Sequence, residues 1–145
     1  MFSIILPVYN GAKFIDNAIE TIFAQDFDNW ELIIVNDGST DGTIDVLQKY
    51  KGNPKVHICS QKNQGVSAAR NTGIGYSQYP YLAFLDADDV WKKNHLSTLY
   101  EMILMYPKAG MYCTFTEAHT ADGHIINECS FFKGKEEIVY LEDFF

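Results

Sequence analysis

Three carboxylates, Asp86, Asp88 and Asp89, follow directly on the apolar run at residues 81–85 (YLAFL), a pattern typical of a buried strand. Ligands of open α/β sheets bind beyond the carboxyl ends of the strands. Asp86 and Asp88 are two apart, so in extended backbone their side chains leave the same face. Two oxygen ligands on one face suit Mg²⁺ or Mn²⁺, which proteins hold with one or two carboxylates plus the phosphates of a substrate.

The alternative is that Asp88 or Asp89 only caps a helix beginning near Val90, since Asp is a favoured N-cap residue. One cap needs one Asp and not three. The cluster therefore favours a cation site.

A second acidic loop, at residues 36–42, follows the apolar run that ends at Val35. Gly38 lets the backbone approach a flat ligand closely, and Asp37 can accept a hydrogen bond from a base edge or a ring N–H. Alternatively, the loop caps the next helix through Ser39, Thr40 and Asp41. Capping does not require Asp37, so we predict a ligand role for it.

Arg70 falls in a predicted helix at residues 65–77, on the same face as Val66, Ala69 and Gly73. A guanidinium buried on that face needs an anionic partner, because an uncompensated buried charge costs about 3–5 kcal/mol. We predict that Arg70 clusters with Asp37 and with the Asp86/Asp88 pair. A purely structural ion pair is the alternative.

Strand-like and helix-like segments alternate along the chain. Strands are predicted at residues 2–9, 30–36, 55–59 and 81–85, and helices at 12–25, 43–51, 65–77 and 92–106. Nearly continuous apolar strands between amphipathic helices indicate βαβ units and a parallel sheet covered on both faces. Strand-like runs at 110–117 and 124–129 flank Asp122-Gly123, a hairpin signal. The sequence predicts an α/β fold, Rossmann-like and mostly parallel, with a C-terminal β-hairpin.

The composition limits the function further. A chain of 145 residues with 47% apolar residues fits one domain, 1–145. The net charge of −8 argues against binding nucleic acid or an anionic membrane. Three cysteines without Cys-x-x-Cys spacing indicate neither disulfides nor zinc, and the expected setting is the reducing cytoplasm. No apolar run approaches the ~20 residues of a transmembrane segment.

Four motifs in order resemble those of family 2 glycosyltransferases with the GT-A fold. They are residues 7–10 (PVYN), 36–41 (NDGSTD), 63–65 (NQG) with 69–73 (ARNTG), and 85–89 (LDADD). Each motif alone is weak, but the order and spacing match over essentially the whole chain.

The resemblance implies a nucleotide-binding site and a divalent metal, Mg²⁺ or Mn²⁺. The implied nucleotide-binding residues are Pro7, Tyr9, Asp37, Gly38, Asn63, Arg70, Asp86 and Ala87. Asp37 would meet a uracil ring, Asp88 would bind the metal, and Asp86 would contact the ribose or the metal through water. The implied reaction is inverting transfer from a UDP-sugar to a carbohydrate or lipid-linked acceptor, in the cytoplasm or at the cytoplasmic face of a membrane.

Members of this family usually continue well beyond this length, with their catalytic base after the segment corresponding to residues 142–143. We therefore expect a chain truncated at its C-terminus, with the base beyond Phe145, since Glu117, Asp122 and Glu128 fall in the predicted hairpin. Two rival functions remain open. One is a Mg²⁺-dependent phosphohydrolase that uses the Asp86/Asp88 pair, and the other is a non-catalytic nucleotide-binding module.

Overall fold

The computed structural model of the protein describes residues 1–114, 118–119 and 125–126. The chain divides into two compact units, Met1–Tyr112 and Cys113–Phe145. In the second unit, β5 (Ala118–His119) and β6 (Ile125–Ile126) pair antiparallel, as the predicted hairpin requires. The expectation of one domain over residues 1–145 stays a prediction. Among the described residues, no helix is long and apolar enough to cross a membrane.

The first unit is built on a parallel four-stranded sheet. Its strands are β1 (Phe2–Val8), β2 (Trp30–Asn36), β3 (Val56–Ser60) and β4 (Tyr81–Phe84), in the order β3-β2-β1-β4. β1 is central and every one of its residues is buried. Its apolar run therefore lacks the polar alternation of a strand with one wet face, which is typical of a parallel sheet covered on both sides.

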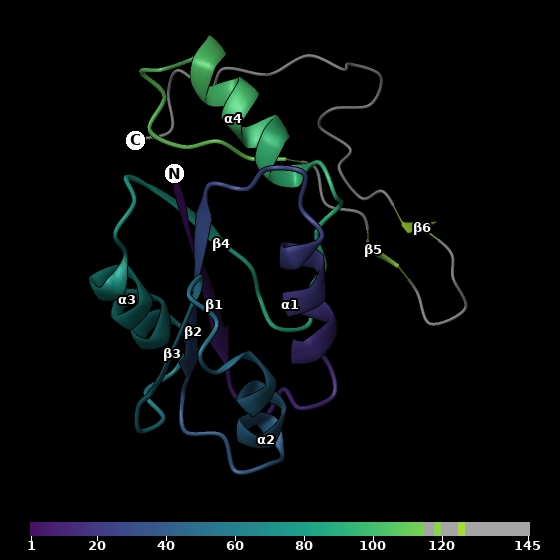
Figure 1. Ribbon diagram of the computed structural model, residues 1–145, viewed down its shortest axis with the longest axis vertical. Coiled ribbons are helices and arrows are strands. Elements are labelled where there is room, and N and C mark those ends of the chain that lie inside the picture. Colours follow the sequence, from purple (N-terminus) through teal and green to yellow (C-terminus); the bar gives the residue numbers. More distant parts are fainter. Residues whose placement is uncertain (115–117, 120–124, 127–145) are drawn as a thin grey trace. The chain divides into compact units, whose positions relative to one another are not determined.

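Helices connect the strands and cover both faces. They are α1 (Ile15–Phe23), α2 (Thr43–Leu47) continued by the 3₁₀ helix η1 (Gln48–Tyr50), α3 (Val66–Tyr76) and α4 (His95–Met105). Figure 1 shows α1 and α2 on one side of the sheet and α3 on the other. Right-handed crossovers explain this, because the chain moves outward from β1 to β3 and then returns to β4. The strand order thus reverses between β1 and β4, where open α/β sheets bind ligands.

Alternate residues of the strands enter two separate cores. The larger core, on the α1 side, contains Phe2, Ile4, Leu6 and Val8 of β1 together with Ile15, Ile19 and Ile22 of α1. The smaller core, on the α3 side, contains Ile33, Val35 and Ala69. There α3 lies very close to the sheet, since a Cβ added at Gly73 would stand 2.6 Å from Cγ2 of Ile5. The same Cβ would stand 3.4 Å from Cγ2 of Val35, so this part of α3 packs against both β1 and β2.

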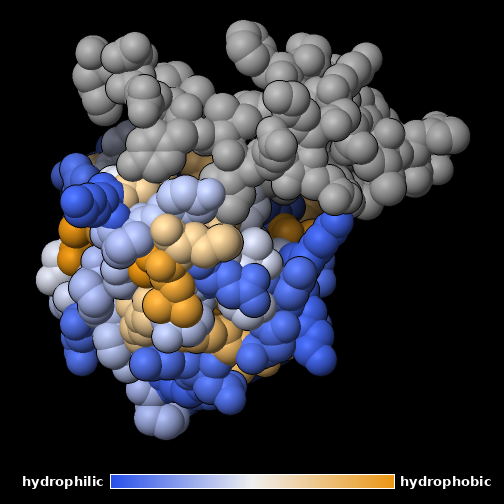
Figure 2. Space-filling model, turned by 90° about the horizontal axis from the view of Figure 1, so that it is seen from above, coloured by the Kyte–Doolittle hydropathy of each residue, from blue (hydrophilic) through white to orange (hydrophobic). Residues whose placement is uncertain are grey.

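The segment after β4 adds α4 to the larger core through Leu96, Leu99 and Ile103. Other apolar side chains at the end of α4 and beyond it are exposed, namely Leu104, Met105 and Met111. Figure 2 views the molecule from above and shows hydrophobic residues in patches among hydrophilic ones.

The predicted strand at 110–117 is wrong for its described part, because residues 110–114 form no strand. The Tyr112 hydroxyl instead donates to the Tyr106 carbonyl (2.6 Å), which ties this segment to the end of α4.

Candidate functional site

Asp37 lies at the end of β2 and is almost fully buried, with 3% of its surface exposed. Its Oδ1 accepts hydrogen bonds from Gln61 Nε2 (2.7 Å) and the Gln64 backbone N–H (3.0 Å), and its Oδ2 accepts from the Gly65 N–H (2.8 Å). Gly65 directly precedes α3. One carboxylate therefore holds the loop that leads from β3 into α3; we call residues 61–65 with Asp37 the Asp37 bracket.

Gln61 is a member of this bracket that the sequence interpretation missed. Its side-chain oxygen accepts from the Thr72 hydroxyl (2.6 Å) while its Nε2 donates to Asp37, so it links α3 to the carboxylate. The available signal was the polar stretch at residues 60–64, directly after a predicted strand. Polar residues at that position can meet a ligand or each other, and periodicity does not distinguish the two.

Gly38 is held against the bracket in a conformation that favours glycine. Its φ is +75°, and a Cβ there would lie 2.7 Å from the backbone nitrogen of Asn63. Gly38 was expected to let a flat ligand approach the backbone closely. On the side where a Cβ would stand, the loop that contains Asn63 makes this close approach instead. The structure accounts for glycine at this position without any ligand.

The loops that follow β1 and β2 are joined by hydrogen bonds. The Asn10 N–H donates to Ser39 Oγ (2.9 Å), and Asn10 Oδ1 accepts from the Thr40 N–H (2.8 Å). Asp41 accepts from the N–H groups of Ala12 (3.1 Å) and Thr43 (3.0 Å), and hydrogen bonding, first of all from Thr43, lowers the Asp41 pKa. The capping interpretation of residues 39–41 therefore holds for Asp41 only in that it accepts from the first N–H of α2; the N-cap residue itself is Gly42, which makes no side-chain cap hydrogen bond. This interpretation leaves Asp37 for another role.

A cavity of about 350 Å³ opens beside these loops. It is lined by Pro7, Val8, Tyr9, Asp37, Asn63, Gly65, Val66 and Ala69. Four of these are predicted nucleotide-binding residues: Pro7, Tyr9, Asp37 and Asn63. The walls are mainly apolar, with few polar groups, which is the usual composition of a small-molecule site.

Pro7 and Tyr9 reach this cavity because of where β1 ends. β4 pairs with β1 only as far as Ile5, whose carbonyl accepts from the Leu85 N–H (3.1 Å). Pro7 has the same orientation two residues later. Its missing N–H therefore points beyond the end of β4, so proline costs the sheet no hydrogen bond there. Tyr9 follows the strand and is 53% exposed, which leaves its ring accessible to a ligand.

The three carboxylates after β4 form a turn in which the Asp89 N–H donates to the Asp86 carbonyl (3.1 Å); we call residues 86–89 the carboxylate turn. Asp86 is partly buried, whereas Asp88 and Asp89 are exposed. Partial desolvation, and then the charges of Asp88 and Asp86, raise the pKa of Asp89. Ala87 would lie 3.6 Å from a Cβ on Gly11, so the turn borders the loop that follows β1.

Arg70 connects α3 to this turn, with its guanidinium NH2 group 2.6 Å from Asp86 Oδ1. The predicted pairing of Arg70 with an acid of the fourth strand is confirmed. The predicted cluster that also included Asp37 is wrong, because that carboxylate is bound by Gln61, Gln64 and Gly65, whereas Arg70 pairs with Asp86. Nε of Arg70 is the one buried side-chain polar atom without a partner in the described part of the chain.

The residues of the turn fit a metal that arrives with its ligand. No group of three or more His, Cys, Asp or Glu side chains in the described ranges could hold a metal ion alone. Asp86 and Asp88 supply two carboxylates, and Mg²⁺ or Mn²⁺ is commonly bound by one or two carboxylates plus substrate phosphates. The donor set therefore agrees with a metal–phosphate complex.

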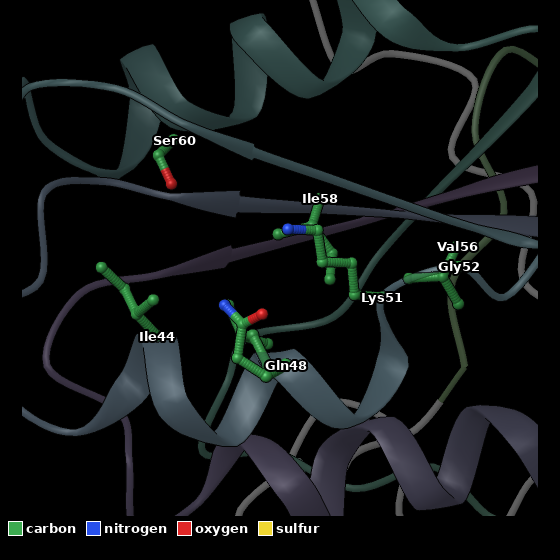
Figure 3. Close-up of a pocket in the computed structure, with 8 residues that line it drawn as sticks. Ile44, Gln48, Lys51, Gly52, Val56, Ile58 and Ser60 are labelled. Carbon is green, nitrogen blue, oxygen red and sulfur yellow. The ribbon is translucent and has the colours of Figure 1, made fainter.

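Figure 3 shows a second cavity, of about 210 Å³, on the α2 side of the sheet. The side chains of Gln48 and Lys51 extend toward β3, where Ser60 faces them. None of the predicted site residues lines this cavity. The arrangement of the predicted residues therefore favours the cavity at Asp37.

Comparison with known proteins agrees with this site. The model of "Glycosyl transferase family 2" matches residues 3–137, which is nearly the whole chain. The chain belongs to glycosyl transferase family 2. The family inferred from four motifs is thereby confirmed, and all four motifs lie within the matched residues.

A relative in Bacillus subtilis (strain 168) is TuaG, a glycosyltransferase named for teichuronic acid biosynthesis. It is 40% identical over 106 residues, which cover 72% of this chain and 42% of TuaG. The chain thus spans less than half the length of that curated relative.

Solved structures share the fold. S. aureus TarS is 28% identical, with a TM-score of 0.68 over 73% of this chain and 20% of TarS. TarS 1-349 in complex with UDP-GlcNAc gives a TM-score of 0.69 at 23% identity, over 84% of this chain and 41% of that one. The mannosyltransferase PcManGT from Pyrobaculum calidifontis, in complex with GDP-Man and Mn²⁺, gives 0.66 at 24% identity, over 70% and 32%. The GT-A fold inferred from the motifs is confirmed.

Proposed function

We propose that this chain is the donor-binding part of an inverting glycosyltransferase and that it binds a nucleotide-diphospho-sugar, in particular a UDP-sugar, with a divalent metal. The observation that carries the proposal is the cavity at the ends of β1 and β2, where Pro7, Tyr9, Asp37 and Asn63 meet. The complex of a structural neighbour with UDP-GlcNAc supports a UDP-sugar as the donor.

Asp37 has the capacity to recognise a base. A carboxylate offers about four lone-pair sites, and the bracket uses three of them, from Gln61, Gln64 and Gly65. The remaining site suits the single imide N–H of uracil. The exposed ring of Tyr9 offers a flat apolar surface for the same base. Asp37 is thus fixed in place before the ligand arrives, which lowers the entropy cost of binding.

The metal of this proposal is Mg²⁺ or Mn²⁺, held by Asp88 and, directly or through water, by Asp86. When bound, it would supply positive charge to a diphosphate leaving group. The Mn²⁺ and GDP-Man complex of PcManGT supports this choice. Arg70 adds a fixed positive charge, since it pairs with Asp86 and still has a buried Nε–H without a partner.

The reaction forms a bond from an acceptor oxygen to the anomeric carbon and breaks the bond from that carbon to the diphosphate. The acceptor hydroxyl must lose its proton to a general base. Asp37 is the one carboxylate among the residues that line the cavity, and in this proposal its three hydrogen bonds within the bracket and a fourth from uracil leave it no site for the acceptor proton. The proposal therefore assigns the base and the acceptor site, for a carbohydrate or a lipid-linked acceptor in the cytoplasm or at its membrane face, to residues outside this cavity.

Calorimetric titration with UDP tests the proposal. We expect UDP to bind when Mn²⁺ is present and Mn²⁺ alone to bind weakly. ADP should bind at least about tenfold more weakly than UDP, because a site built to hydrogen-bond one base discriminates strongly against a base that lacks the matching group. Equal binding of UDP and ADP would contradict base recognition by Asp37. Hydrolysis of p-nitrophenyl phosphate, lost in Asp86→Asn, would instead favour the phosphohydrolase.

A further inference from the structure

The C-terminal end of α1 is tied to the segment that follows the carboxylate turn. Gln25 is a buried amide with 6% of its surface exposed. Its Nε2 donates to the Lys92 carbonyl (2.9 Å), and its Oε1 accepts from the Leu96 N–H (3.0 Å) at the start of α4. Nε2 also donates to the Thr21 carbonyl (3.0 Å). Both N–H groups and the oxygen of this amide therefore take part in hydrogen bonds.

Two further hydrogen bonds join the same segments. The Trp91 N–H donates to Thr21 Oγ1 (3.2 Å), and the Asp26 N–H donates to the Lys93 carbonyl (3.0 Å). Thr21 is itself fixed, because its hydroxyl donates to the Ala18 carbonyl (2.8 Å) one turn earlier in α1. The backbone of residues 91–96 thus lies against one rigid helix end.

The carboxylate turn lies between two points at which the chain is attached to the rest of the fold. On its N-terminal side, the Leu85 N–H donates to the Ile5 carbonyl of β1, and Asp86 pairs with Arg70. On its C-terminal side, the Trp91 N–H donates to the Thr21 hydroxyl of α1. Asp88, Asp89 and Val90 are exposed residues between the two, so the position of Asp88 depends on both attachments.

We propose that Gln25, which touches neither cavity, is a positioning residue for the metal-binding carboxylates of the site. The proposal rests on the proposed function, since it assigns to Gln25 the task of holding the turn that would carry Asp88. Its physical basis is that residues outside a metal's ligand set fix the orientation of the ligands, and their loss commonly costs about 10–100-fold in metal affinity. A hydrophobic residue of the same size would fill the space but remove the acceptor of the Leu96 N–H, and it would leave the Lys92 carbonyl with its hydrogen bond from the His95 N–H (3.0 Å) but without the one from Gln25.

The test compares Gln25→Leu and the volume-conserving Gln25→Glu with the wild-type chain. An ionised Glu at this position can still accept from Leu96 but cannot donate to Lys92. We expect the Kd for UDP with Mn²⁺ to rise about tenfold in both variants. The Kd for UDP in EDTA should change less than about twofold, since the Asp37 bracket is untouched. Thr21→Val, which removes only the hydroxyl that accepts from Trp91, should act in the same direction.

Ser3→Ala is the matched control for a loss of stability alone. Ser3 is buried at the opposite ends of the strands, donates to Glu31 (2.6 Å) and accepts from the Tyr79 N–H (3.0 Å). We expect it to lower the melting temperature but to leave both Kd values as in the wild type. Gln25 variants with unchanged Mn²⁺-dependent binding would overturn the proposal, and so would an equal loss of binding in Mn²⁺ and in EDTA.

Hydrogen exchange separates this proposal from the proposed function. The Leu96 N–H should exchange at least about tenfold faster in Gln25→Leu than in the wild type, because its acceptor is gone. A wild-type chain that binds no UDP would remove the proposed function and, with it, the role assigned to Gln25. If the wild-type chain binds UDP but the Leu96 N–H exchanges at the same rate in Gln25→Leu as in the wild type, the role of Gln25 is contradicted and the proposed function stands.

Discussion

The Asp37 bracket and the carboxylate turn both place acids at the ends of strands, but they hold them very differently. Asp37 is 3% exposed and accepts three hydrogen bonds, whereas Asp88 is exposed and Asp86 has one ion pair. A carboxylate that is enclosed by donors is part of the fold as well as of the site. A carboxylate in solvent is free to bind a cation that comes with a substrate. The two regions therefore predict different results for the same kind of substitution.

The largest effect is expected at Asp37. Asp37→Ala removes the acceptor of Gln61, Gln64 and Gly65, and buried donors without partners cost about 1–3 kcal/mol each. Partial rehydration of the loop should limit the loss of unfolding free energy to about 3 kcal/mol, measured by urea denaturation. UDP binding should be lost as well. Asp45→Ala, at an exposed acid of α2, is the control; equal stability of the two variants would mean that the bracket does not hold the loop.

Gly38→Ala sharpens the comparison within the bracket. The positive φ of +75° costs a non-glycine residue about 1–2 kcal/mol, and the new methyl group would meet the Asn63 nitrogen at 2.7 Å. We expect a loss of about 2–3 kcal/mol of unfolding free energy and weaker UDP binding. Gly52→Ala has a φ of +89° but nothing within 4 Å, so it measures the backbone strain alone. If the two variants lose the same stability, the contact with Asn63 contributes nothing.

Asp88→Asn examines the carboxylate turn. Because Asp88 is exposed, the free energy of unfolding should change by less than about 0.5 kcal/mol. The affinity for UDP in Mn²⁺ should fall about tenfold, which is about 1.4 kcal/mol, while the affinity in EDTA stays the same. Calorimetry with both buffers gives the difference, and Asp45→Asn controls for the lost charge. A loss of affinity that is equal with and without Mn²⁺ would argue against Asp88 as a metal ligand.

Much of the first unit could be predicted from the sequence, because burial on both sides of a parallel sheet leaves a strong apolar pattern. The second strand, Trp30–Asn36, has the predicted bounds, and each other predicted strand and helix in residues 1–106 is present, with ends shifted by a few residues. α1 begins three residues later than predicted because the segment before it makes the Asn10–Thr40 and Ala12–Asp41 hydrogen bonds. Such contacts between loops leave no periodic signal.

The site was predictable in its residues but not in its pairings. Four of the predicted nucleotide-binding residues line the cavity, yet the motifs did not show that Asp37 binds Gln61, Gln64 and Gly65. Arg70 was expected to be buried because it shares a helix face with Ala69 and Gly73. That face covers β1, and Arg70 lies at its border, beside the turn that follows the short edge strand β4. Helical periodicity gives a direction but not the width of the sheet below.

The smallest effect on stability is expected at the ion pair of Arg70 and Asp86, because both side chains are partly exposed. The side chains of Arg70 and Asp86 are 35% and 45% exposed, so solvent screens their attraction. Such pairs contribute about 0.2–1 kcal/mol to stability, well below the 3–5 kcal/mol of a buried charge left alone. We expect Arg70→Lys to lower the free energy of unfolding by less than about 1 kcal/mol.

The Arg70→Lys substitution should change the affinity for UDP more than it changes the free energy of unfolding. Lysine keeps the charge but lacks the Nε–H, which is buried and has no partner in the described residues. If that N–H serves a ligand, UDP affinity should fall about fivefold to tenfold in Arg70→Lys, consistent with one charge-assisted hydrogen bond partly replaced. Lys49→Arg, at the exposed pair with Asp16, is the reverse exchange at a site remote from the cavity and should leave UDP binding unchanged. Unaltered affinity in Arg70→Lys would mean that Arg70 only supports Asp86. The carboxylate turn would then resemble the Asp37 bracket, as a region organised by its own contacts.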